Sequence, residues 1–298
     1  MEIYLHKQGL KGVFDIEQYC IDNNIDAKKV TYLVCSDNKL TELKGLDKLV
    51  SLERLNCRNN KLIELNVSNL VNLRELWCNN NKLTELDVNN LVNLRELNCD
   101  DNNLTKLDLS KLFKLRGLWC DNNNLTELSV SKLVNLEYLN CSNNLLTELD
   151  VNNLFKLKWL ICDNNNLTKL DVSKLFKLEW LWCRNKKLTE IKGLDNLVNL
   201  TELRCYSHKL TETKGLDNLV NLRWLNDEKY KKPVIDLIKK QREAYGMTQK
   251  EFAVALGLSE TNGDRYIREV ESGRKKPSGL FIRCLELFVE NEDLKNGL

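Results

Sequence analysis

The chain is poor in several residue types on which whole classes of protein depend. Among its 298 residues are two prolines and two histidines, and its formal net charge is +2. The histidines are His6 and His208, and no Cys-x-x-Cys pair occurs, so the sequence offers no zinc site. The nearly even balance of charge gives no global electrostatic signal for nucleic acid or for a membrane surface.

Long hydrophobic runs are also missing. No stretch approaches the roughly 18 continuous apolar residues of a membrane-spanning helix. The first residues, Met-Glu-Ile-Tyr-Leu-His-Lys, lack the basic segment and apolar core of a signal peptide. We therefore expect a cytoplasmic protein without a membrane partner.

Cysteine, in contrast, recurs with a regular period. Nine of the eleven cysteines follow one another at an almost constant interval: Cys35, Cys57, Cys78, Cys99, Cys120, Cys141, Cys162, Cys183 and Cys205. Disulfide frameworks lack such regularity, whereas a residue that returns once per unit indicates a structural repeat. We expect each of these cysteines to be a small buried apolar side chain, with a redox or catalytic role as the weaker alternative.

Other residues keep the same period. The unit around Cys78 reads L-x-x-L-x-C-x-x-N-x-L-x-x-L-x-V-x-x-L from Leu73 to Leu91, and Leu94 starts the next. Leu76 and Cys78 are two residues apart and therefore share one face of a short strand. A single coil cannot bury its leucines, but stacked coils can. The pattern closely resembles the short, internalin-like leucine-rich repeat over about residues 30 to 227.

This resemblance implies an α/β repeat fold: a solenoid with a parallel sheet on its concave side and short 3-10 or irregular segments on its convex side. It also implies a ladder of buried asparagines at Asn38, Asn60, Asn81, Asn102, Asn123, Asn144 and Asn165. Lys186 and His208 occupy the later positions, so we expect the ladder to break there and the coils to loosen. Residues 14–21 have helical apolar spacing, and we expect residues 1–30 to form an N-terminal cap, 31–227 the solenoid, and 228–298 a separate domain.

The tryptophans share one kind of position. The residues on either side of the second leucine of each unit should face outward on the concave side, and all six tryptophans lie there: Trp77, Trp119, Trp159, Trp180, Trp182 and Trp224. Tyr138, Trp159 and Trp180 share a column on strands about 4.8 Å apart and could stack for stability alone. Alternatively they form a binding surface. Trp77, Trp119 and Trp224 have no aromatic neighbour in their columns, which favours binding.

Charged residues accompany these aromatic residues. Acidic side chains are expected in the middle of the face and Arg58, Arg184 and Arg204 towards its ends. An acidic centre with aromatic anchors predicts a basic protein partner, with a carbohydrate stacked on tryptophan as a weaker alternative. Besides the tryptophans, the predicted partner-binding residues are Glu96, Asp100, Asp101, Asp121, Tyr138 and Asp163.

The periodicity ends after Asp227. Thr248 followed by Glu251 predicts a capping box at the start of a helix. Three segments, Thr248-Gln249-x-x-Phe252-Ala253, Gly257-Leu258-Ser259 and Glu271-x-Gly273-Arg274-x-x-Pro277, resemble a Cro/lambda-repressor-like helix-turn-helix domain, a small all-α fold. The interval from Gly257 to Glu271 is longer than usual for that family, and Asn262-Gly263 fits a variant of it.

The resemblance implies binding of double-stranded DNA through residues 247–277. Gln249 would approach a phosphate, Asn262, Asp264, Arg265, Tyr266 and Arg268 would lie nearest the bases, and Arg274, Lys275 and Lys276 would meet the backbone. Residues 228–298 contain 14 Lys and Arg against 12 Asp and Glu, a net of +2, which is weakly basic for a DNA-binding domain. A dimerisation or docking module therefore stays an alternative.

No phosphate-binding loop, metal-ligand cluster or nucleophile with a plausible base is evident, so we expect neither an enzyme nor a cofactor. The first functional hypothesis is a solenoid that captures or inhibits a basic protein, with a helix-turn-helix that regulates its own gene or aids docking. This pairing suits a bacterial mobile element and inhibitors of host defence such as anti-CRISPR proteins. The second hypothesis is a transcription regulator whose repeats sense a protein or a ligand.

Overall fold

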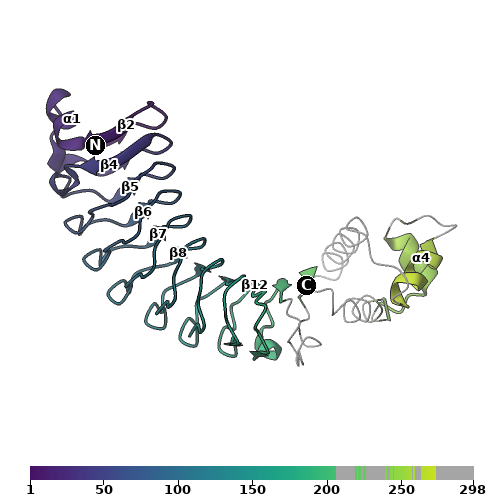
Figure 1. Ribbon diagram of the computed structural model, residues 1–298. Coiled ribbons are helices and arrows are strands. Elements are labelled where there is room, and N and C mark those ends of the chain that lie inside the picture. Colours follow the sequence, from purple (N-terminus) through teal and green to yellow (C-terminus); the bar gives the residue numbers. More distant parts are fainter. Residues whose placement is uncertain are drawn as a thin grey trace. The chain divides into compact units, whose positions relative to one another are not determined.

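The computed structural model describes residues 1–205, 219, 221–222, 224–225, 239, 242–243, 245–256, 258 and 263–272. The chain divides into two compact units, Met1–Asn221 and Leu222–Leu298. The first unit is a curved stack of coils (Figure 1). The boundary expected at residue 227 lies outside the described residues.

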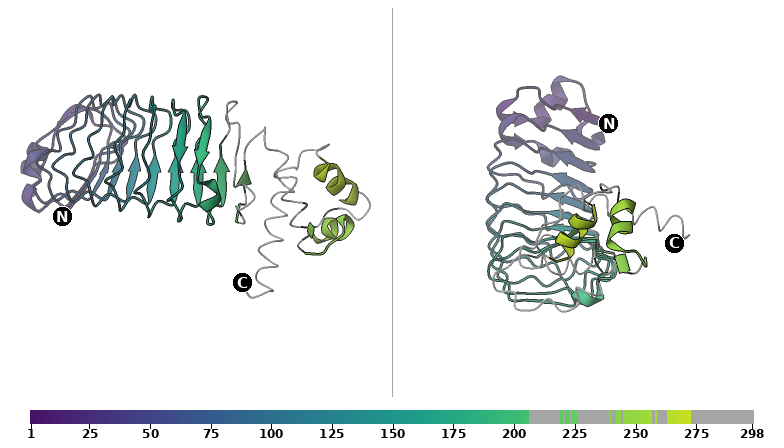
Figure 2. Two further views of the ribbon diagram at one scale, coloured as in Figure 1. Left: turned by 90° about the horizontal axis from the view of Figure 1, so that it is seen from below. Right: turned by 90° about the vertical axis from the view of Figure 1, so that its right-hand side faces the viewer.

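Most coils of the first unit contribute one short strand to a parallel sheet, whose arrows lie side by side in Figure 2. In order along the sheet, these strands are β1 (Glu2–Tyr4), β3 (Tyr32–Val34), β5 (Arg54–Asn56), β6 (Glu75–Trp77), β7 (Glu96–Asn98), β8 (Gly117–Trp119), β9 (Tyr138–Asn140), β10 (Trp159–Ile161), β12 (Trp180–Trp182) and β14 (Glu202–Arg204). The central leucines are in register, for example Leu76 opposite Leu97. The predicted repeat fold is confirmed.

Secondary structure is sparse on the rest of each coil. Two further parallel pairs join β2 (Lys11–Asp15) to β4 (Lys39–Lys44) and β11 (Lys169–Asp171) to β13 (Glu190–Lys192). Apart from one N-terminal α-helix, the other described elements of this unit are 3-10 turns, namely η1 (Ala27–Lys29), η2 (Leu46–Lys48) and η3 (Leu194–Asn196). No helix among the described residues is long and apolar enough to span a bilayer.

The N-terminal segment continues the solenoid although its sequence lacks the repeat. Strand β1 pairs in parallel with β3, and helix α1 (Ile16–Asp22) follows β2. The Asp15 side chain caps this helix by accepting hydrogen bonds from the backbone N–H groups of Glu17 and Gln18. Because strand pairing uses backbone groups, β1 needs no repeat pattern to extend the sheet.

The core of the solenoid consists of stacked leucines and cysteines. All nine repeat cysteines are fully buried, and each is a free thiol. Burial raises the pKa of the Cys35 and Cys141 thiols to about 12, because a thiolate is disfavoured away from water. These cysteines act as small apolar core residues, as predicted.

Buried asparagines join neighbouring coils. The Nδ2 of Asn123 donates to the carbonyl oxygens of Cys99 and Cys120, at 3.0 and 3.2 Å. Its Oδ1 accepts from the backbone N–H of Leu104 at 2.9 Å. The residue before each of these asparagines has a positive φ, such as Asn122 at 52°, and is always Asn or Asp, the non-glycine residues that best tolerate this conformation.

The prediction that the ladder breaks at Lys186 is wrong. Asn185, one residue earlier, is fully buried and its Nδ2 donates to the carbonyl oxygens of Cys162 and Cys183, both at 3.1 Å. Its Oδ1 accepts from the backbone N–H of Asn165 at 2.7 Å. The ladder therefore continues with a shift of one residue; the second predicted break, at His208, lies outside the described residues.

Coils with one extra residue contain a glycine turn. Gly45 and Gly193 have φ values of 74° and 84° and precede η2 and η3, respectively. A Cβ on Gly193 would lie 2.2 Å from the Cα of Ser173 in the preceding coil. Only glycine therefore lets the longer coil stack on its neighbour at this point.

A row of exposed apolar side chains follows the edge at which the sheet strands begin. Each lies four residues before a strand, as Phe113 does before β8, and each is 42–54% exposed. We call this row the flank ridge; its members are Val50, Val71, Val92, Phe113, Val134, Phe155, Phe176 and Val198. The sequence contains a signal for this row, because Val or Phe recurs at this position in successive units. The prediction of the concave face did not use that signal.

The described part of the second unit contains β15 (Trp224–Leu225) and helices α3 (Gln249–Ala255) and α4 (Gly263–Glu271). The predicted capping box at Thr248 and Glu251 is confirmed. The helices share a small core of Phe252, Ala253, Leu256, Ile267 and Val270.

Candidate functional site

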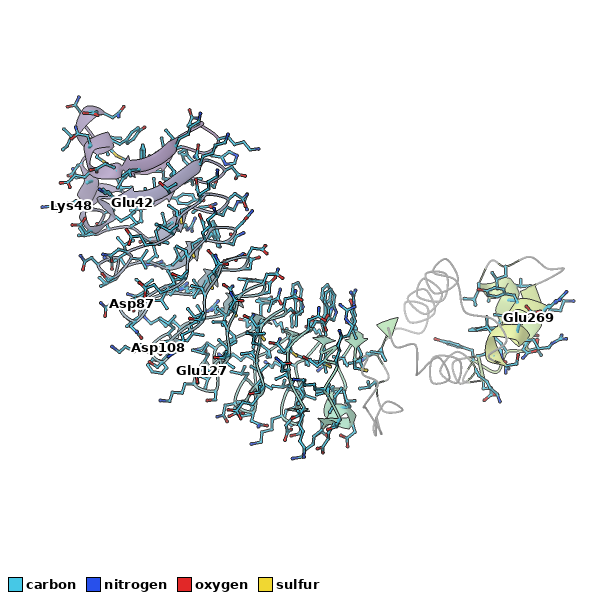
Figure 3. All side chains as sticks on the ribbon, viewed as in Figure 1. Glu42, Lys48, Asp87, Asp108, Glu127 and Glu269 are labelled. Carbon is cyan, nitrogen blue, oxygen red and sulfur yellow. The ribbon has the colours of Figure 1, made fainter. Side chains whose placement is uncertain are left out.

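The concave sheet exposes two columns of side chains. In β9, for example, Leu139 is buried, whereas Tyr138 and Asn140 on either side of it are half-buried. The parallel register aligns these positions from one coil to the next, so side chains one repeat apart in the sequence become neighbours. Figure 3 shows the side chains that project along the stack.

The aromatic side chains from β8 to β12 form one continuous group, which we call the aromatic row: Trp119, Tyr138, Trp159, Trp180 and Trp182. The rings of Trp159 and Trp180 are parallel within 7°, with centroids 4.5 Å apart. Trp180 and Trp182 are 6.3 Å apart and parallel within 3°. Tyr138 meets Trp159 edge to face at 5.0 Å. Such contacts stabilise the row itself.

Trp119 has no aromatic neighbour in its own column, where Asn98 and Asn140 flank it, but it contacts an aromatic ring of the other column. Its ring lies over Gly117, where a Cβ would come within 2.6 Å of ring atoms Cη2 and Cζ3. From there it stacks on Tyr138, with centroids 6.5 Å apart and planes within 11°. The missing side chain of Gly117 therefore lets Trp119 cross into the neighbouring column. Trp77 has no ring neighbour among the described residues, and the side chain of Trp224 lies outside them.

The far end of the aromatic row is covered by a cation. The guanidinium carbon of Arg204 lies 3.6 Å from the centroid of Trp182, and its Nε donates to Glu202 at 2.8 Å. Trp159 and Trp180 cover one another's faces at 4.5 Å, and Arg204 covers a face of Trp182, so ring edges make up much of the surface left for a partner. Sugars and bases stack on open ring faces, and this geometry disfavours them.

Two carboxylates near the strand ends have strongly raised pKa values. Burial, with repulsion from Asp121 and Asp101, raises the pKa of Asp100 to about 7. Burial also raises the pKa of Asp121 to about 6. The Nδ2 of Asn140 donates to Asp121 at 2.8 Å, and Asp100 Oδ1 has no hydrogen-bond partner among the described residues. Near pH 7 this cluster is therefore less negative than its composition suggests.

Two other predicted acidic residues differ in environment. Asp163 is buried and bound to Arg184 of the next coil, accepting from its backbone N–H at 2.7 Å and from its Nε at 2.8 Å. It is already neutralised within the fold. Glu96 stays half-buried beside Glu75, and its pKa is raised by burial and by that neighbour. The acidic residues of the predicted set that stay open to a partner are thus Glu96, Asp100, Asp101 and Asp121.

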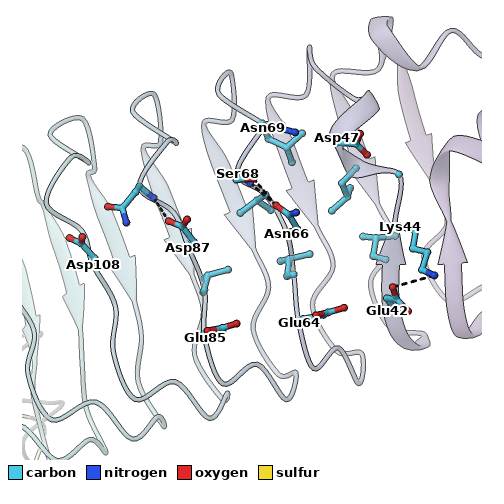
Figure 4. Close-up of a pocket in the computed structure, with 18 of the residues that line it drawn as sticks. Glu42, Lys44, Asp47, Glu64, Asn66, Ser68, Asn69, Glu85, Asp87 and Asp108 are labelled. Atoms are coloured by element: carbon cyan, nitrogen blue, oxygen red, sulfur yellow. Dashed lines mark hydrogen bonds and ion pairs between the residues drawn. The ribbon is translucent and has the colours of Figure 1, made fainter.

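A groove that the sequence did not predict crosses the first coils away from the concave sheet (Figure 4). Its volume is about 950 Å³, and its lining includes Glu64, Glu85, Asp87 and Asp108. Asp87 and Asp108 accept hydrogen bonds from backbone N–H groups two residues ahead, at 3.0 and 2.9 Å. They thereby shape the turns of their own coils, which accounts for their presence.

The side chains of His6, Ser36 and Asp37 meet near the first strands but do not form a catalytic triad. His6 Nδ1 lies 2.9 Å from Ser36 Oγ and 3.3 Å from Asp37 Oδ2. A triad needs the serine and the carboxylate on different ring nitrogens, and Ser36 is almost fully buried. Among the residues described, no group of His, Cys, Asp and Glu is arranged to hold a metal ion.

In the second unit, Gln249 takes part in an internal network. Its Nε2 donates to Glu271 at 2.7 Å, and Arg242 Nε donates to the same carboxylate at 2.7 Å. The predicted phosphate-contacting amide thus connects α3 with α4. Arg265 and Arg268 are exposed on α4, with Arg265 paired to Glu269 at 2.9 Å.

The remaining predicted DNA contacts are less accessible or undescribed. Tyr266 packs partly against the helical core. The side chain of Asp264 lies outside the described residues, and so do Asn262, Arg274, Lys275 and Lys276.

Solved structures resemble the solenoid. The functional domain of InlJ from Listeria monocytogenes, which includes a cysteine ladder, is 34% identical with a TM-score of 0.58, over 67% of this chain and 50% of that one. Internalin C2 from Listeria monocytogenes is 25% identical with a TM-score of 0.54, over 67% of this chain and 82% of that one. The leucine-rich-repeat protein LIC12759 from Leptospira interrogans has the same fold at 24% identity and a TM-score of 0.57, over 72% of this chain and 66% of that one.

The C-terminal region has different relatives. Residues 238–283 match the helix-turn-helix family model. The type II methyltransferase M.SsoII from Shigella sonnei is 48% identical over 60 residues, which are 20% of this chain and 16% of that protein. M1.ScrFI from Lactococcus lactis subsp. cremoris is 45% identical over 60 residues, 20% and 15% of the two chains.

The two sets of matches cover different parts of the chain. It spans about half of the InlJ structure and about one-sixth of the methyltransferases, whose likeness is confined to the helix-turn-helix region. The protein is a leucine-rich-repeat solenoid of the short, internalin-like kind, followed by a helix-turn-helix region.

Proposed function

We propose that the concave face of the solenoid binds another protein and that the chain performs no catalysis of its own. The aromatic row carries this proposal, because five large rings on adjacent strands remain half-buried on a sheet face that the described residues leave uncovered. Tryptophan and tyrosine supply large, rigid contact area and dominate the energetics of many protein interfaces.

The geometry also favours a certain partner chemistry. Ring edges carry partial positive charge, so apolar groups and carbonyl oxygens suit the aromatic row. A lysine or arginine of the partner would meet Asp100, Asp101 and Asp121. A basic partner thus remains our proposal, supported by these three carboxylates and Glu96, since Asp163 is paired within the fold.

A second activity, DNA binding, is favoured by the match of residues 238–283 to the helix-turn-helix family. Exposed Arg265 and Arg268 on α4 would contact DNA. Together the two activities would suit a protein that captures or inhibits a basic nucleic-acid-handling enzyme, as anti-CRISPR proteins encoded by mobile elements do. They would equally suit a transcription regulator whose repeats sense a protein.

An affinity pull-down with the full chain tests the concave face. The variant Trp180→Ala/Trp182→Ala should lose the specific partner, whereas Ile63→Ala, which removes an exposed apolar side chain away from the sheet, should retain it. Recovery of the same proteins by all three chains would contradict the proposal. Circular dichroism of each variant checks the fold.

A DNA-binding assay separates the two activities. Arg265→Ala/Arg268→Ala should weaken DNA binding while leaving partner capture unchanged. If this variant lost capture and the tryptophan variant kept it, the regulator hypothesis would replace the capture hypothesis.

A further inference from the structure

The flank ridge lies outside the concave face and is not used by the proposed function. Its eight side chains occupy the same place in eight successive coils and are each about half-exposed. Isolated exposed valines are ordinary, but a continuous apolar row is not, because it keeps water in contact with hydrocarbon along its length.

Cations accompany the row. Where the ridge residue is phenylalanine, lysines stand beside it in the sequence: Lys111 and Lys114 around Phe113, Lys156 after Phe155, and Lys174 and Lys177 around Phe176. Three residues further on, towards the sheet, come Arg74, Arg95, Arg116 and Lys158. The overall charge of the chain is close to zero, so this local excess is hidden in the total.

Few of these cations are neutralised within the fold. Lys158 pairs with Glu137 at 2.9 Å, and Lys114 donates to the neutral Asn93 at 2.7 Å. Lys132, Lys174 and Lys177 form no ion pair or hydrogen bond in the part of the chain that the structure describes. Acidic residues near the ridge are Asp47, Glu53, Glu137, Glu179 and Asp195. Asp47 and Asp195 lie beside valines at the two ends of the row, and Glu53 faces Arg74 at 3.7 Å. The surroundings of the phenylalanines thus remain positively charged.

We infer that the flank ridge docks onto an anionic lipid surface. A bilayer interface accepts aromatic and aliphatic side chains at the level of the headgroups, and its negative charge attracts lysines and arginines on either side. A DNA backbone would satisfy the cations but leave the phenylalanines in water. A protein groove would have to provide an apolar channel as long as the row. A bilayer accommodates both the apolar row and the cations, and it needs no repeating structure of its own to match the coils.

This inference goes beyond the proposed function and changes one prediction made from the sequence. The absence of a spanning helix among the described residues and the small net charge argued against a membrane partner, but neither observation bears on a peripheral surface. Because the ridge follows the edge where strands begin, binding there would leave the aromatic row open to its own partner.

Co-sedimentation with vesicles tests the inference on the full chain. The protein should pellet with vesicles of phosphatidylcholine and phosphatidylglycerol and remain in solution with phosphatidylcholine alone. Phe113→Ser/Phe155→Ser/Phe176→Ser should weaken binding at least about tenfold. The matched control Ile63→Ser/Leu145→Ser removes exposed apolar side chains elsewhere and should bind as the wild type does.

A charge variant keeps the test decisive if the serine variant does not fold. Lys132→Gln/Lys174→Gln/Lys177→Gln should lose the preference for phosphatidylglycerol, whereas Lys61→Gln/Lys82→Gln/Lys106→Gln, exposed away from the ridge, should keep it. Failure of the wild type to pellet with anionic vesicles, or equal pelleting of both lysine variants, would overturn the inference. Loss of binding to a DNA duplex by the ridge-lysine variant alone, with no vesicle binding by the wild type, would reassign the surface to nucleic acid.

Discussion

A single missing side chain organises the start of the aromatic row. Gly117 leaves the space into which the ring of Trp119 folds, and that placement brings Trp119 onto Tyr138. The neighbouring strands carry Glu96 and Tyr138 at the same position, so glycine here is an exception within its column. The contact between Trp119 and Tyr138 therefore depends on this one glycine and is not a feature that the repeat produces in every coil.

Restoring a side chain at this position should break the contact. In Gly117→Ala the new Cβ would displace the Trp119 ring, which can rotate towards solvent, so we expect a loss of stability below about 1 kcal/mol. Near-UV circular dichroism should show a reduced aromatic signal. An unchanged spectrum would contradict the placement of Trp119. Gly117 does not have a positive φ, so the substitution itself adds no left-handed backbone strain.

Asp100 should make stability depend on pH. Its pKa is raised from 3.8 to about 7, so the fold holds a proton that the unfolded chain releases near pH 4. The wild type should therefore lose stability as pH rises from about 4 to 7. Asp100→Asn should be more stable than the wild type at pH 8, by about 1–2 kcal/mol after allowance for partial exposure, with little difference at pH 4. Urea unfolding at both pH values measures this; an advantage independent of pH would contradict it.

At the scale of the coil, the asparagine ladder connects one unit with the next. Asn123→Ala would leave the Leu104 N–H without its acceptor. The buried carbonyl oxygens of Cys99 and Cys120 would each lose one of their two asparagine donors and keep the other, from Asn102 and Asn144 respectively. We expect a loss of about 2–3 kcal/mol in the free energy of unfolding. Asn124→Ala, at the adjacent exposed position, should change it by less than about 0.5 kcal/mol. Equal effects in chemical denaturation would argue against a structural role for the ladder.

The structure of the coil can be predicted well from the sequence, because the same residue types recur at the same positions in every unit. Leu76 and Cys78, two residues apart and repeated in each unit, are enough to place a strand and both of its faces. The same period places Asp163 directly beside Arg184, its counterpart in the next unit, so this ion pair could have been predicted from the spacing. The ring of Trp119 could not, because its position depends on a side-chain rotation into a local gap. Nor could the role of Asn185, which requires a shift of the backbone by one residue.

At the scale of the whole molecule, burial of the thiols gives a direct measure of the solenoid's integrity. The ten cysteines that the structure describes are all buried, and only Cys284 lies outside the described residues. In native buffer, at most one thiol should react with a thiol reagent, whereas all eleven should react in denaturant. Rapid reaction of several thiols in the native protein would contradict the stacked core.

The uniform length of the central coils has a consequence for how such a protein changes between generations. From Cys57 to Cys183 every interval between repeat cysteines is the same, and the longer coils with Gly45 and Gly193 lie at either end of this run. Loss or duplication of one unit in the gene would keep both the reading frame and the stacking of leucine, cysteine and asparagine. Replication slippage within this tract could therefore lengthen or shorten the binding face by whole coils in a single event, while the ends remained the same.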